Sequence, residues 1–215
     1  MIKFEQIEVW GIKHAIRGMR NPLNSWERSD TVFDGDKMCL GENDIDLMTR
    51  LIRGGAPHRK FLRQIFVSVD ITAPLYWWKE FDTYKVGTTA NSCSTMHKIQ
   101  AKEFTLDDFS HEHLIENHSG EVEGIEYLDF VIGGLNKYRK RYLETNDKKY
   151  WWQMIQLLPT SYNQKRTVTM TYENLLNMLE YRRGHKLDEW RMFCDWILTL
   201  PYGSLLKEGV SNEQS

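Results

Sequence analysis

The chain has 215 residues, 41% of them apolar, and a formal net charge of −2 with a pI near 6.4. This length and apolar content suit a single domain over residues 1–215. The near-neutral charge argues against a protein that binds nucleic acid through a broad basic surface. No apolar run approaches the roughly 20 residues of a membrane span, and three widely spaced cysteines do not suggest a disulfide framework. We expect a soluble, cytoplasmic protein.

The first part of the chain is predicted to contain two strands and at least two helices. Alternating apolar and polar residues indicate strands, Gly, Asn-Pro and Asp-Gly sequences indicate turns, and Asn-Asp followed by Gly-Gly suits a helix start and stop. In chain order we expect a strand over 2–9, an irregular segment over 11–42, a helix from Asn43-Asp44 to Gly54-Gly55, one or two helical turns over 58–64, a strand over 65–72, an aromatic-rich helix after Ala73-Pro74, and a loop of small polar residues up to His97.

The second part is predicted to be mainly helical with one further strand. Thr105 and Asp108 resemble a capping box that opens a helix, and apolar residues at helical spacing follow further along. In chain order we expect helices from Thr105 to about His118 and over 122–143, a helix around 151–158 ended by Pro159, a strand over 165–171, helices over 172–183 and 187–199, and a flexible tail after about 203. Strands at both ends with helices between and after them predict an α+β fold with a small antiparallel sheet.

Arg182 is the most informative single residue. It lies seven residues after Leu175, on the same stripe as Met178 and Leu179. A guanidinium on an inward-facing stripe needs an anionic partner or strong acceptors, because burying it unpaired is very costly. The alternative is an arginine near a helix end that extends to water. Spacing alone supports the two interpretations equally.

Other reactive side chains give weaker patterns. His111, His113 and His118 lie close in sequence, but none of their spacings is the i, i+4 pair that two metal ligands on one helix need, so we expect no metal site. Cys93 and His97 form a thiolate–imidazole pair if their loop is helical, although no third orienting group can be named. Trp77 and Trp78 are interpreted first as core aromatics and second as a stacking surface for a flavin, folate or base.

Residues 73–97, AP-LYWWKEFDTYKVGTTANSCSTMH, resemble the central signature of the flavin-dependent thymidylate synthases of the ThyX type. The resemblance covers roughly residues 43–97 and 150–192 in the family's order, and it includes His58 and the strand IFVSVDITAP. After Ala-Pro the family has a short helix, Arg-His-Arg, and a run containing Ser, Asn-Glu, Ser and Arg-Tyr. Here those positions are Thr83-Tyr84-Lys85, Thr88, Ala90-Asn91, Cys93 and Thr95-Met96.

The second block, QLLPTSYNQKRTVTMTYENLLNMLEYRR, resembles the family's Leu-Pro, strand and Asn-x-Arg-x-Leu helix. Asn177 and Arg182 fall on family positions that contact the flavin and the nucleotide. Glu173, Thr171 and Ile155 stand where the family has an Arg, an Asn and a phosphate-holding Arg. Charge-assisted arginine contacts to phosphate are strong and often bidentate, and neither Thr nor Ile replaces them. The cations that remain or could substitute are Lys85, Arg182, Arg59, Arg63 and Arg166.

The resemblance implies an enzyme that transfers a one-carbon unit from methylenetetrahydrofolate to C5 of a uracil nucleotide. FAD would be the cofactor, NADPH its reductant, and a homotetramer the assembly. The implied residues are Arg182 for catalysis, His58, Tyr84, Lys85 and Asn177 for the flavin, and Glu80, Thr88, Cys93 and Arg182 for the nucleotide.

Three functions compete at this point. The first is a divergent flavin-dependent pyrimidine nucleotide methyltransferase, and the second is a non-catalytic nucleotide-binding protein, such as a ligand scavenger, on the same fold. The third is an interaction protein that uses only the oligomeric scaffold. Arg182, Asn177 and His58 favour the first two over the third, and the replaced Arg-His-Arg motif keeps the second open.

Overall fold

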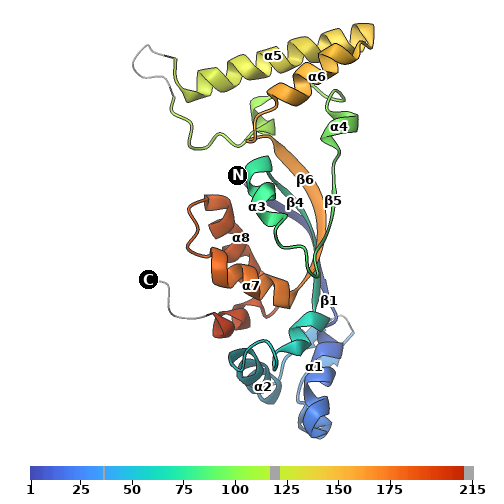
Figure 1. Ribbon diagram of the computed structural model, residues 1–215. Helices are drawn as coiled ribbons and strands as arrows, with labels where there is room; N and C mark the ends of the chain where they lie inside the picture. Colours follow the sequence, from blue (N-terminus) through green and yellow to red (C-terminus); the bar gives the residue numbers. More distant parts are fainter. Residues whose placement is uncertain (36, 117–121, 211–215) are drawn as a thin grey trace. The chain divides into compact units, whose positions relative to one another are not determined.

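The computed structural model describes residues 1–35, 37–116 and 122–210. They form a mixed helix and sheet fold, with a four-stranded sheet in the order β1-β4-β6-β5 and an antiparallel hairpin β2-β3 (Figure 1). The strands are β1 Lys3–Trp10, β2 Val32–Asp34, β3 Lys37–Cys39, β4 Phe66–Pro74, β5 Thr89–Ser92 and β6 Asn163–Thr171. The α-helices are α1 Ile12–Arg20, α2 Glu42–Arg53, α3 Leu75–Phe81, α4 Thr95–Lys98, α5 Gly124–Thr145, α6 Lys148–Leu157, α7 Tyr172–Arg182 and α8 Asp188–Thr199. The predicted α+β class with a small sheet is confirmed.

The chain folds as two compact units, each built from three separate segments. The first unit contains residues 1–4, 70–83 and 90–167, and the second contains residues 5–69, 84–89 and 168–215. Every strand of the four-stranded sheet contributes residues to both units. The sequence-based interpretation as one domain stays a prediction.

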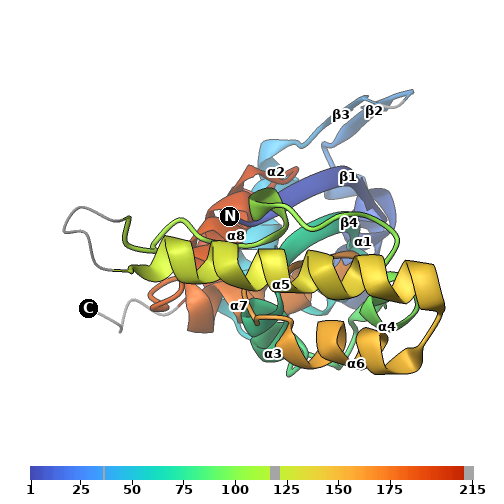
Figure 2. The ribbon, with the colours of Figure 1, turned by 90° about the horizontal axis from the view of Figure 1, so that it is seen from above.

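In the first unit, α5 and α6 lie side by side (Figures 1 and 2). One face of α5 is apolar at helical spacing and is buried against α6 and the segment before α5. Asn136 on α5 exchanges two 2.8 Å hydrogen bonds with the backbone of Phe104, which fixes that segment. The buried members of this cluster are Ile99, Phe104, Phe109, Leu128, Ile132, Leu135 and Met154.

The paired tryptophans of α3 belong to the interior. Trp77 and Trp78 are both 0% exposed. The Trp78 indole donates a 2.9 Å hydrogen bond to the carbonyl of Gln164, and the Arg166 guanidinium lies 4.2 Å from the centre of its ring. A ligand cannot stack on rings without exposed surface, so the core interpretation holds and the stacking interpretation is wrong.

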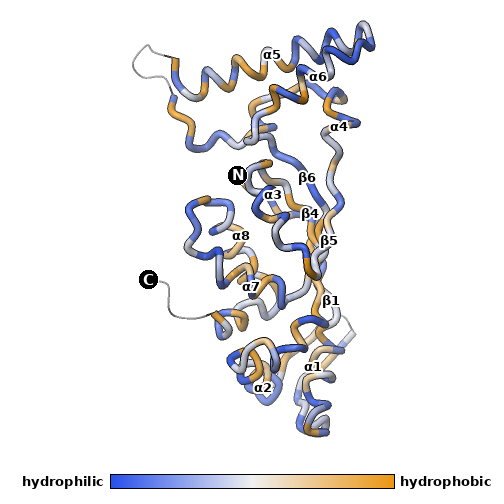
Figure 3. Tube along the Cα trace, viewed as in Figure 1, coloured by the Kyte–Doolittle hydropathy of each residue, from blue (hydrophilic) through white to orange (hydrophobic). Residues whose placement is uncertain are grey.

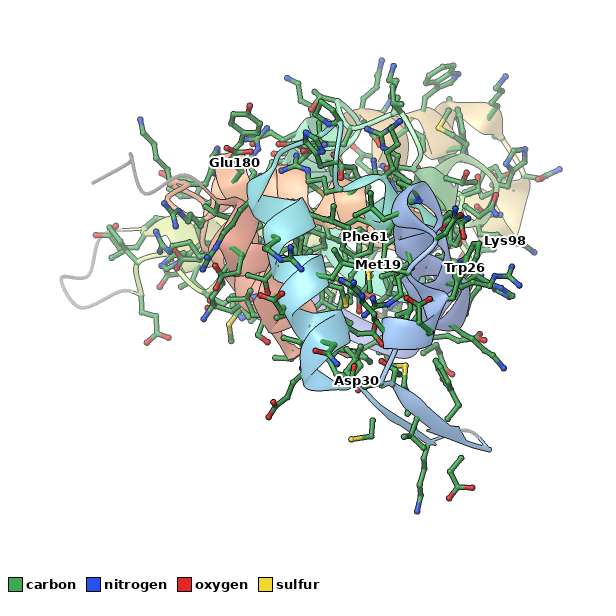
Figure 4. The ribbon with its side chains drawn as sticks, turned by 90° about the horizontal axis from the view of Figure 1, so that it is seen from below. Met19, Trp26, Asp30, Phe61, Lys98 and Glu180 are labelled. Carbon is green, nitrogen blue, oxygen red and sulfur yellow. The ribbon has the colours of Figure 1, made fainter. Side chains whose placement is uncertain are left out.

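In the second unit, α7 and α8 pack together through buried apolar faces. Helix α1 packs against η3, the 3-10 turn Lys60–Gln64. Figure 4 labels Met19 and Phe61, buried side chains from these two elements. The α7 and α8 residues with at most 3% exposure include Leu175, Leu176, Met178, Leu179, Trp190, Phe193 and Ile197.

Helix α2 begins at Glu42 and is capped from a distant residue. Asp30, labelled in Figure 4, accepts hydrogen bonds from the backbone N–H groups of Asn43 and Asp44 at 2.9 and 3.1 Å. The predicted helix up to Gly54-Gly55 is confirmed, but the Asn43-Asp44 cap is wrong, because both residues lie inside the first turn. A carboxylate from another segment supplies the acceptor that the first turn needs.

Most of the remaining predicted elements are confirmed. In β4 the buried residues Val67, Val69, Ile71 and Ala73 alternate with less buried ones, as the pattern predicts. The aromatic-rich helix is α3, the two long helical stripes are α5 and α6, and the strand before α7 is β6.

Residues 11–42 are not irregular. They contain α1, the β2-β3 hairpin, and the 3-10 turns η1 Asn21–Leu23 and η2 Trp26–Arg28. Gly11, at the start of the segment that we predicted to be irregular, is the N-cap of α1 with φ of 90°. A Cβ there would lie 2.0 Å from the Gln64 carbonyl oxygen. The glycine therefore starts a helix.

Three further predictions need correction. The Thr105–Asp108 capping box exists, but it opens only the turn η4 Leu106–Asp108 and no helix follows it as far as Glu116; His118 lies outside the described residues. The loop after α3 contains the short strand β5 and the helix α4. The segment after 203 begins with η5 Gly203–Gly209, in which Leu206 is buried, while residues 211–215 lie outside the described part. None of the helices in the described ranges is long and apolar enough to cross a membrane.

Candidate functional site

Arg182 is held between two aromatic rings of the second unit. Its Nε donates a 2.8 Å hydrogen bond to the Tyr84 hydroxyl, and its guanidinium lies 4.7 Å from the ring centre of Trp190 and 5.5 Å from that of Tyr84. The two rings meet edge to face at 5.8 Å. Such contacts restrict a long side chain to few rotamers. We call Tyr84 and Trp190 the aromatic clamp.

The loop 84–89 is fastened to the start of α7. Asn174 Nδ2 donates a 2.7 Å hydrogen bond to the carbonyl of Val86, and Asn174 also exchanges capping-box bonds with Thr171. Gly87 has φ of +74°, and a Cβ there would approach Asn174 Oδ1 to 3.0 Å. Asn174 therefore joins the helix start and the loop that carries Tyr84 and Lys85.

Thr88 and Lys85 of this loop carry polar groups that a ligand could use. Thr88 Oγ1 is buried and has no hydrogen-bond partner within the described residues. The Lys85 side chain is exposed. An unsatisfied buried hydroxyl costs free energy that a bound polar group would recover.

A buried ion pair neutralises Glu173. The Arg59 Nε lies 3.2 Å from both Glu173 carboxylate oxygens, and its Nη2 donates a 3.3 Å hydrogen bond to Asn177 Oδ1. Arg59 and Glu173 are 8% and 7% exposed. The pair shows how the chain accommodates a buried acid at Glu173. It also means that Arg59 is engaged inside the chain.

The remaining residues singled out from the sequence include His58, Glu80, Arg63 and Arg166. His58 is exposed and packs against Gly54, where an added Cβ would lie 3.2 Å from its ring. Glu80 is half-buried near the end of α3, in the first unit. Arg166 pairs with Asp82 at 2.7 Å, and Arg63 is exposed.

The first unit has a cavity of about 440 Å³ beside Cys93. Its walls come from the end of β4, the segment from Cys93 to Phe104, the turn η4 and the start of β6. Three lysines, two aspartates and an apolar base line it, and Lys98, the lysine without an ion pair in the described ranges, is the cation that suits an anion attached to a ring. The residues of its lining that the argument uses are Cys93, Lys98, Lys102, Phe104, Asp107, Asp108, Tyr162 and Lys165.

Charges around this cavity are partly paired. Lys102 forms an ion pair with Asp108, and Lys165 lies 3.3 Å from Asp70. Lys98 has no ion pair within the described residues. Burial raises the pKa of the Tyr162 phenol, and the Asp108 carboxylate adds to the increase, so Tyr162 is a neutral donor at physiological pH.

The backbone around Cys93 is well fixed. Its N–H donates to the Lys165 carbonyl at 2.9 Å, and its carbonyl accepts from Gln164 Nε2 at 2.8 Å. Ser94 caps α4, and its hydroxyl lies 2.8 Å from His97 Nδ1. Ser94 is thus a group that orients His97, which the sequence did not reveal.

Sequence reasoning missed the lysines of the cavity. Lys98 and Lys102 are four residues apart, a spacing that puts two side chains on one side of a helical segment, but Lys165 comes from a distant strand. The His111 ring hydrogen-bonds the Phe109 carbonyl at 2.9 Å. Within the ranges that the structure covers, no group of three or more His, Cys, Asp or Glu residues could hold a metal ion.

The fold has counterparts among solved structures. Two structures of the flavin-dependent thymidylate synthase ThyX from Helicobacter pylori, complexed with FAD and dUMP, are 17% and 16% identical to this chain, with TM-scores of 0.68 and 0.69. The matches cover 96% and 99% of this chain and 100% of theirs. This chain has a ThyX-like fold.

Another solved structure with a similar fold is the UMP/dUMP methylase PolB from Streptomyces cacaoi bound with 5-Br UMP. It is 14% identical with a TM-score of 0.65, and the match covers 97% of this chain and 92% of PolB. No protein-family model and no curated protein sequence matches the chain. The resemblance predicted from two sequence blocks is therefore confirmed as a ThyX-like fold, one that serves both a thymidylate synthase and a UMP/dUMP methylase.

Proposed function

We propose that this protein is a flavin-dependent pyrimidine nucleotide methyltransferase of the thymidylate synthase type. It would transfer a one-carbon unit from methylenetetrahydrofolate to C5 of a uracil nucleotide, with NADPH as the reductant. The observation that carries the proposal is the lysine-lined cavity beside Cys93 in a chain with a ThyX-like fold.

The cavity residues suit a nucleotide phosphate. The ammonium of Lys98, which lacks an ion pair in the described part of the chain, would hold the phosphate, and the neutral Tyr162 hydroxyl would donate to it. Cys93 lines the same wall. In the second unit, Arg182, fixed by the aromatic clamp, and the unsatisfied Thr88 hydroxyl would offer polar contacts to a pyrimidine nucleotide. In the first unit, Glu80 would offer a further contact.

The residues present also fit a flavin. Lys85 is an exposed cation that would pair with the FAD diphosphate, and His58 is an exposed ring on the same unit. Tyr84 and Asn177 would line the flavin while their oxygen atoms accept from Arg182 and Arg59. Bound FAD would supply hydride and one-carbon transfer chemistry, and the chain would supply position and electrostatics.

The proposal includes a cytoplasmic homo-oligomer, expected to be a tetramer. Cys39, Cys93 and Cys194 are all free, which suits a reducing compartment. Exposed aromatic side chains such as Trp152 and Phe130 suit an interface between copies.

A specific observation favours a second candidate, a non-catalytic nucleotide-binding protein. Two of the groups that stand in or near the altered family motifs are engaged within the chain: Arg59 pairs with Glu173, and the Tyr84 hydroxyl accepts from Arg182. A chain in which these groups already have internal partners could bind a nucleotide without binding FAD.

The colour of the purified protein separates the two candidates. The methyltransferase should take up FAD, show the visible absorption band of oxidised flavin, and lose that band on anaerobic addition of NADPH. It should also form thymidylate or its ribose analogue from dUMP or UMP. A colourless protein that takes up no FAD but is stabilised by a nucleotide would exclude the enzyme and support the binder.

Lys98→Ala tests the cavity under either candidate. Loss of a charge-assisted contact of about 1.5–3 kcal/mol should weaken dUMP or UMP binding about 10- to 100-fold in calorimetric titration. Lys79→Ala, which removes an exposed lysine of α3, is the matched control and should leave the dissociation constant unchanged. Equal effects of the two changes would show that the cavity does not hold the nucleotide.

A further inference from the structure

Helix α1 forms a groove with the segment from Trp26 to Phe33. The groove has a volume of about 250 Å³, and all of its lining residues belong to the second unit. Hydrophobic and hydrophilic residues alternate along α1 (Figure 3), and Ile12, Ala15 and Met19 are buried in the unit. The basic and aromatic side chains of the groove lining are Lys13, His14, Arg17, Arg20, Trp26 and Phe33.

This groove has cations in its lining and no acid. Within the described ranges, none of its lining residues is Asp or Glu. A larger cavity of about 400 Å³ on the same unit includes Glu27 and Asp46, and the cavity of the first unit includes Asp107 and Asp108. Of these three, the groove beside α1 is the one that offers its cations to an anion without a competing carboxylate in the lining.

Two cations of the groove are available to a ligand. Lys13 and Arg17 are exposed, and neither forms an ion pair within the residues that the structure covers. The Lys13 ammonium lies 5.3 Å from the centre of the Phe33 ring, a cation–π contact that keeps it at the groove. Arg20 is different, because its Nε donates a 2.7 Å hydrogen bond to Asp44 Oδ1, which neutralises its charge. A ligand anion would therefore meet Lys13 and Arg17.

Trp26, labelled beside α1 in Figure 4, gives the groove an aromatic ring. It is 51% exposed, and its indole N–H donates a 2.9 Å hydrogen bond to Asn21 Oδ1. Since its polar group already has a partner, the apolar ring is the part of Trp26 that remains for a ligand. The segment after it is also fixed, because the Ser29 hydroxyl donates a 2.8 Å hydrogen bond to Asp44. A ring held in place beside cations suits stacking with a planar ring that carries negative charge.

We propose that this groove binds a nucleoside polyphosphate. The base would stack on Trp26, and the phosphates would pair with Lys13 and Arg17, with His14 as a further donor. A carboxylate carries one negative charge, whereas a polyphosphate carries several and matches two cations and an imidazole. The groove shares no residue with the cavity beside Cys93, and the inference does not depend on methyl transfer.

The ligand is a free nucleotide and not a nucleic acid strand. Proteins that bind single strands present successive aromatic rings along a basic channel. Here Trp26 and two available cations meet in a single groove, and the formal net charge of the chain is −2. These features accommodate one nucleotide unit.

Calorimetric titration with ATP tests the groove. The titration uses the full chain with Lys98→Ala, so that the cavity of the first unit contributes little to binding. Arg17→Ala and Trp26→Leu should each raise the dissociation constant about 10-fold, since each removes a charge-assisted or a stacking contact. Lys60→Ala, which removes an exposed lysine of the same unit outside the groove, is the control and should leave the constant unchanged. No binding of ATP, or binding that neither groove variant weakens, overturns the proposal.

The two halves of the ligand are tested separately with adenosine and with inorganic triphosphate. Each should bind about 10-fold or more weakly than ATP, because each makes only the stacking or only the charged contacts. Trp26→Leu should weaken adenosine binding, and Arg17→Ala should weaken triphosphate binding. Triphosphate that binds as tightly as ATP would show a plain anion site and contradict the nucleoside part. A short single-stranded oligothymidylate that binds more tightly than ATP through the same two residues would also sink the proposal.

Amide hydrogen exchange locates the bound ATP. Protection should appear over residues 13–17 and 26–33 and should be lost in Arg17→Ala. Protection confined to residues 93–108 would place ATP in the cavity of the first unit and refute the second site. This measurement needs neither flavin nor methyl transfer. A colourless and inactive protein that shows the expected protection would therefore support the groove while the methyltransferase proposal fails.

Discussion

The Tyr84 hydroxyl accepts a 2.8 Å hydrogen bond from Arg182 Nε. From the sequence resemblance we expected Tyr84 to stand at the histidine of the Arg-His-Arg motif. Spacing had left two interpretations of Arg182 open. The structure combines them: the guanidinium is neither unpaired nor simply solvated, since a hydroxyl and two ring faces hold it. No pattern on α7 alone could reveal this, because Tyr84 is nearly a hundred positions away and Trp190 belongs to another helix.

The coupling between Tyr84 and Arg182 is measurable without any ligand. Tyr84→Phe removes the acceptor and keeps the ring, and Arg182→Lys keeps the charge and removes the fixed guanidinium geometry. A double-mutant cycle by urea unfolding should give a coupling of about 0.5–1.5 kcal/mol. Tyr181→Phe, at a tyrosine that is 66% exposed on the same helix, should give a coupling with Arg182→Lys near zero. Equal couplings would show that the clamp does not position Arg182.

Asp44 is a second residue whose role comes from distant partners. It is 0% exposed and accepts from Ser29, Thr31 and Arg20, which brings the 29–31 segment to α2. Burial alone would raise the pKa of the Asp44 carboxyl, but the hydrogen bonds from Thr31, Ser29 and Arg20 and the charge of Arg20 together lower it below its ordinary value of 3.8.

Asp44→Asn should destabilise the fold by about 3–5 kcal/mol at neutral pH, because it leaves the buried Arg20 guanidinium without an anion. The lowered folded-state pKa means that Asp44 contributes its stability above about pH 4, and the contribution is lost as the pH falls through the folded-state pKa. The difference between wild type and Asp44→Asn in urea unfolding should therefore narrow below pH 4. Asp46→Asn, which removes an exposed i, i+4 pair with Arg50, should cost less than about 1 kcal/mol. A gap that widens on acidification would contradict this account.

At the scale of elements, hydrophobic periodicity in the sequence predicted the strands and helices that bury one face in the structure. The alternation in β4 and the stripes in α5, α6 and α7 are visible in the sequence because one face of each is buried. Helix α1 carries the same signal in Ile12, Ala15, Ile16 and Met19, but the turn residues on either side of it led to an irregular prediction. All four residues of β5 are exposed, so it leaves no alternation to detect.

The candidate site was predicted less well than the fold, for a physical reason. Arg182 was singled out by its spacing on a helical stripe and Cys93 by its closeness to His97, and a family resemblance added their roles. Lys98, Lys102 and Tyr162 gather at the cavity through turns and short helices without periodicity. The helix predicted after Thr105 is wrong for a related reason, because a local start signal does not ensure that a helix continues. A capping box satisfies the first N–H groups, but a helix continues only where an apolar stripe is available for burial.

Asn174 joins two elements, the start of α7 and the loop 84–89. Asn174→Ala removes the hydrogen bond to the Val86 carbonyl and the capping-box acceptor for Thr171, and should cost about 1–2 kcal/mol. Amide hydrogen exchange should quicken at residues 84–89 and in the first turn of α7, while α5 is unchanged. Gln156→Ala, an exposed change on α6, should leave exchange in both places as in the wild type. Unaltered exchange at 84–89 would mean that the loop is held by other contacts.

At the scale of the whole molecule, the two compact units are interleaved along the chain. Each takes three segments, and the boundaries fall inside the strands of the four-stranded sheet. A unit made of separated segments cannot be separated from the rest of the chain by cleavage at one peptide bond. When half of a strand unfolds, the ladder hydrogen bonds of that half are also lost. Two contact clusters are therefore compatible with one cooperative domain.

We expect one unfolding transition for the chain, because β1, β4 and β6 each have residues in both units. Unfolding of either unit would therefore disrupt strands that the other unit also contains. Hydrogen exchange read in urea for α5 and for α2, one helix from each unit, should give the same midpoint as tryptophan fluorescence at one fixed protein concentration. The control is Phe61→Ala, a core change in the second unit that should cost about 3–5 kcal/mol and lower both midpoints together. If the α2 midpoint falls while that of α5 stays in place, the units unfold independently and the chain contains two domains.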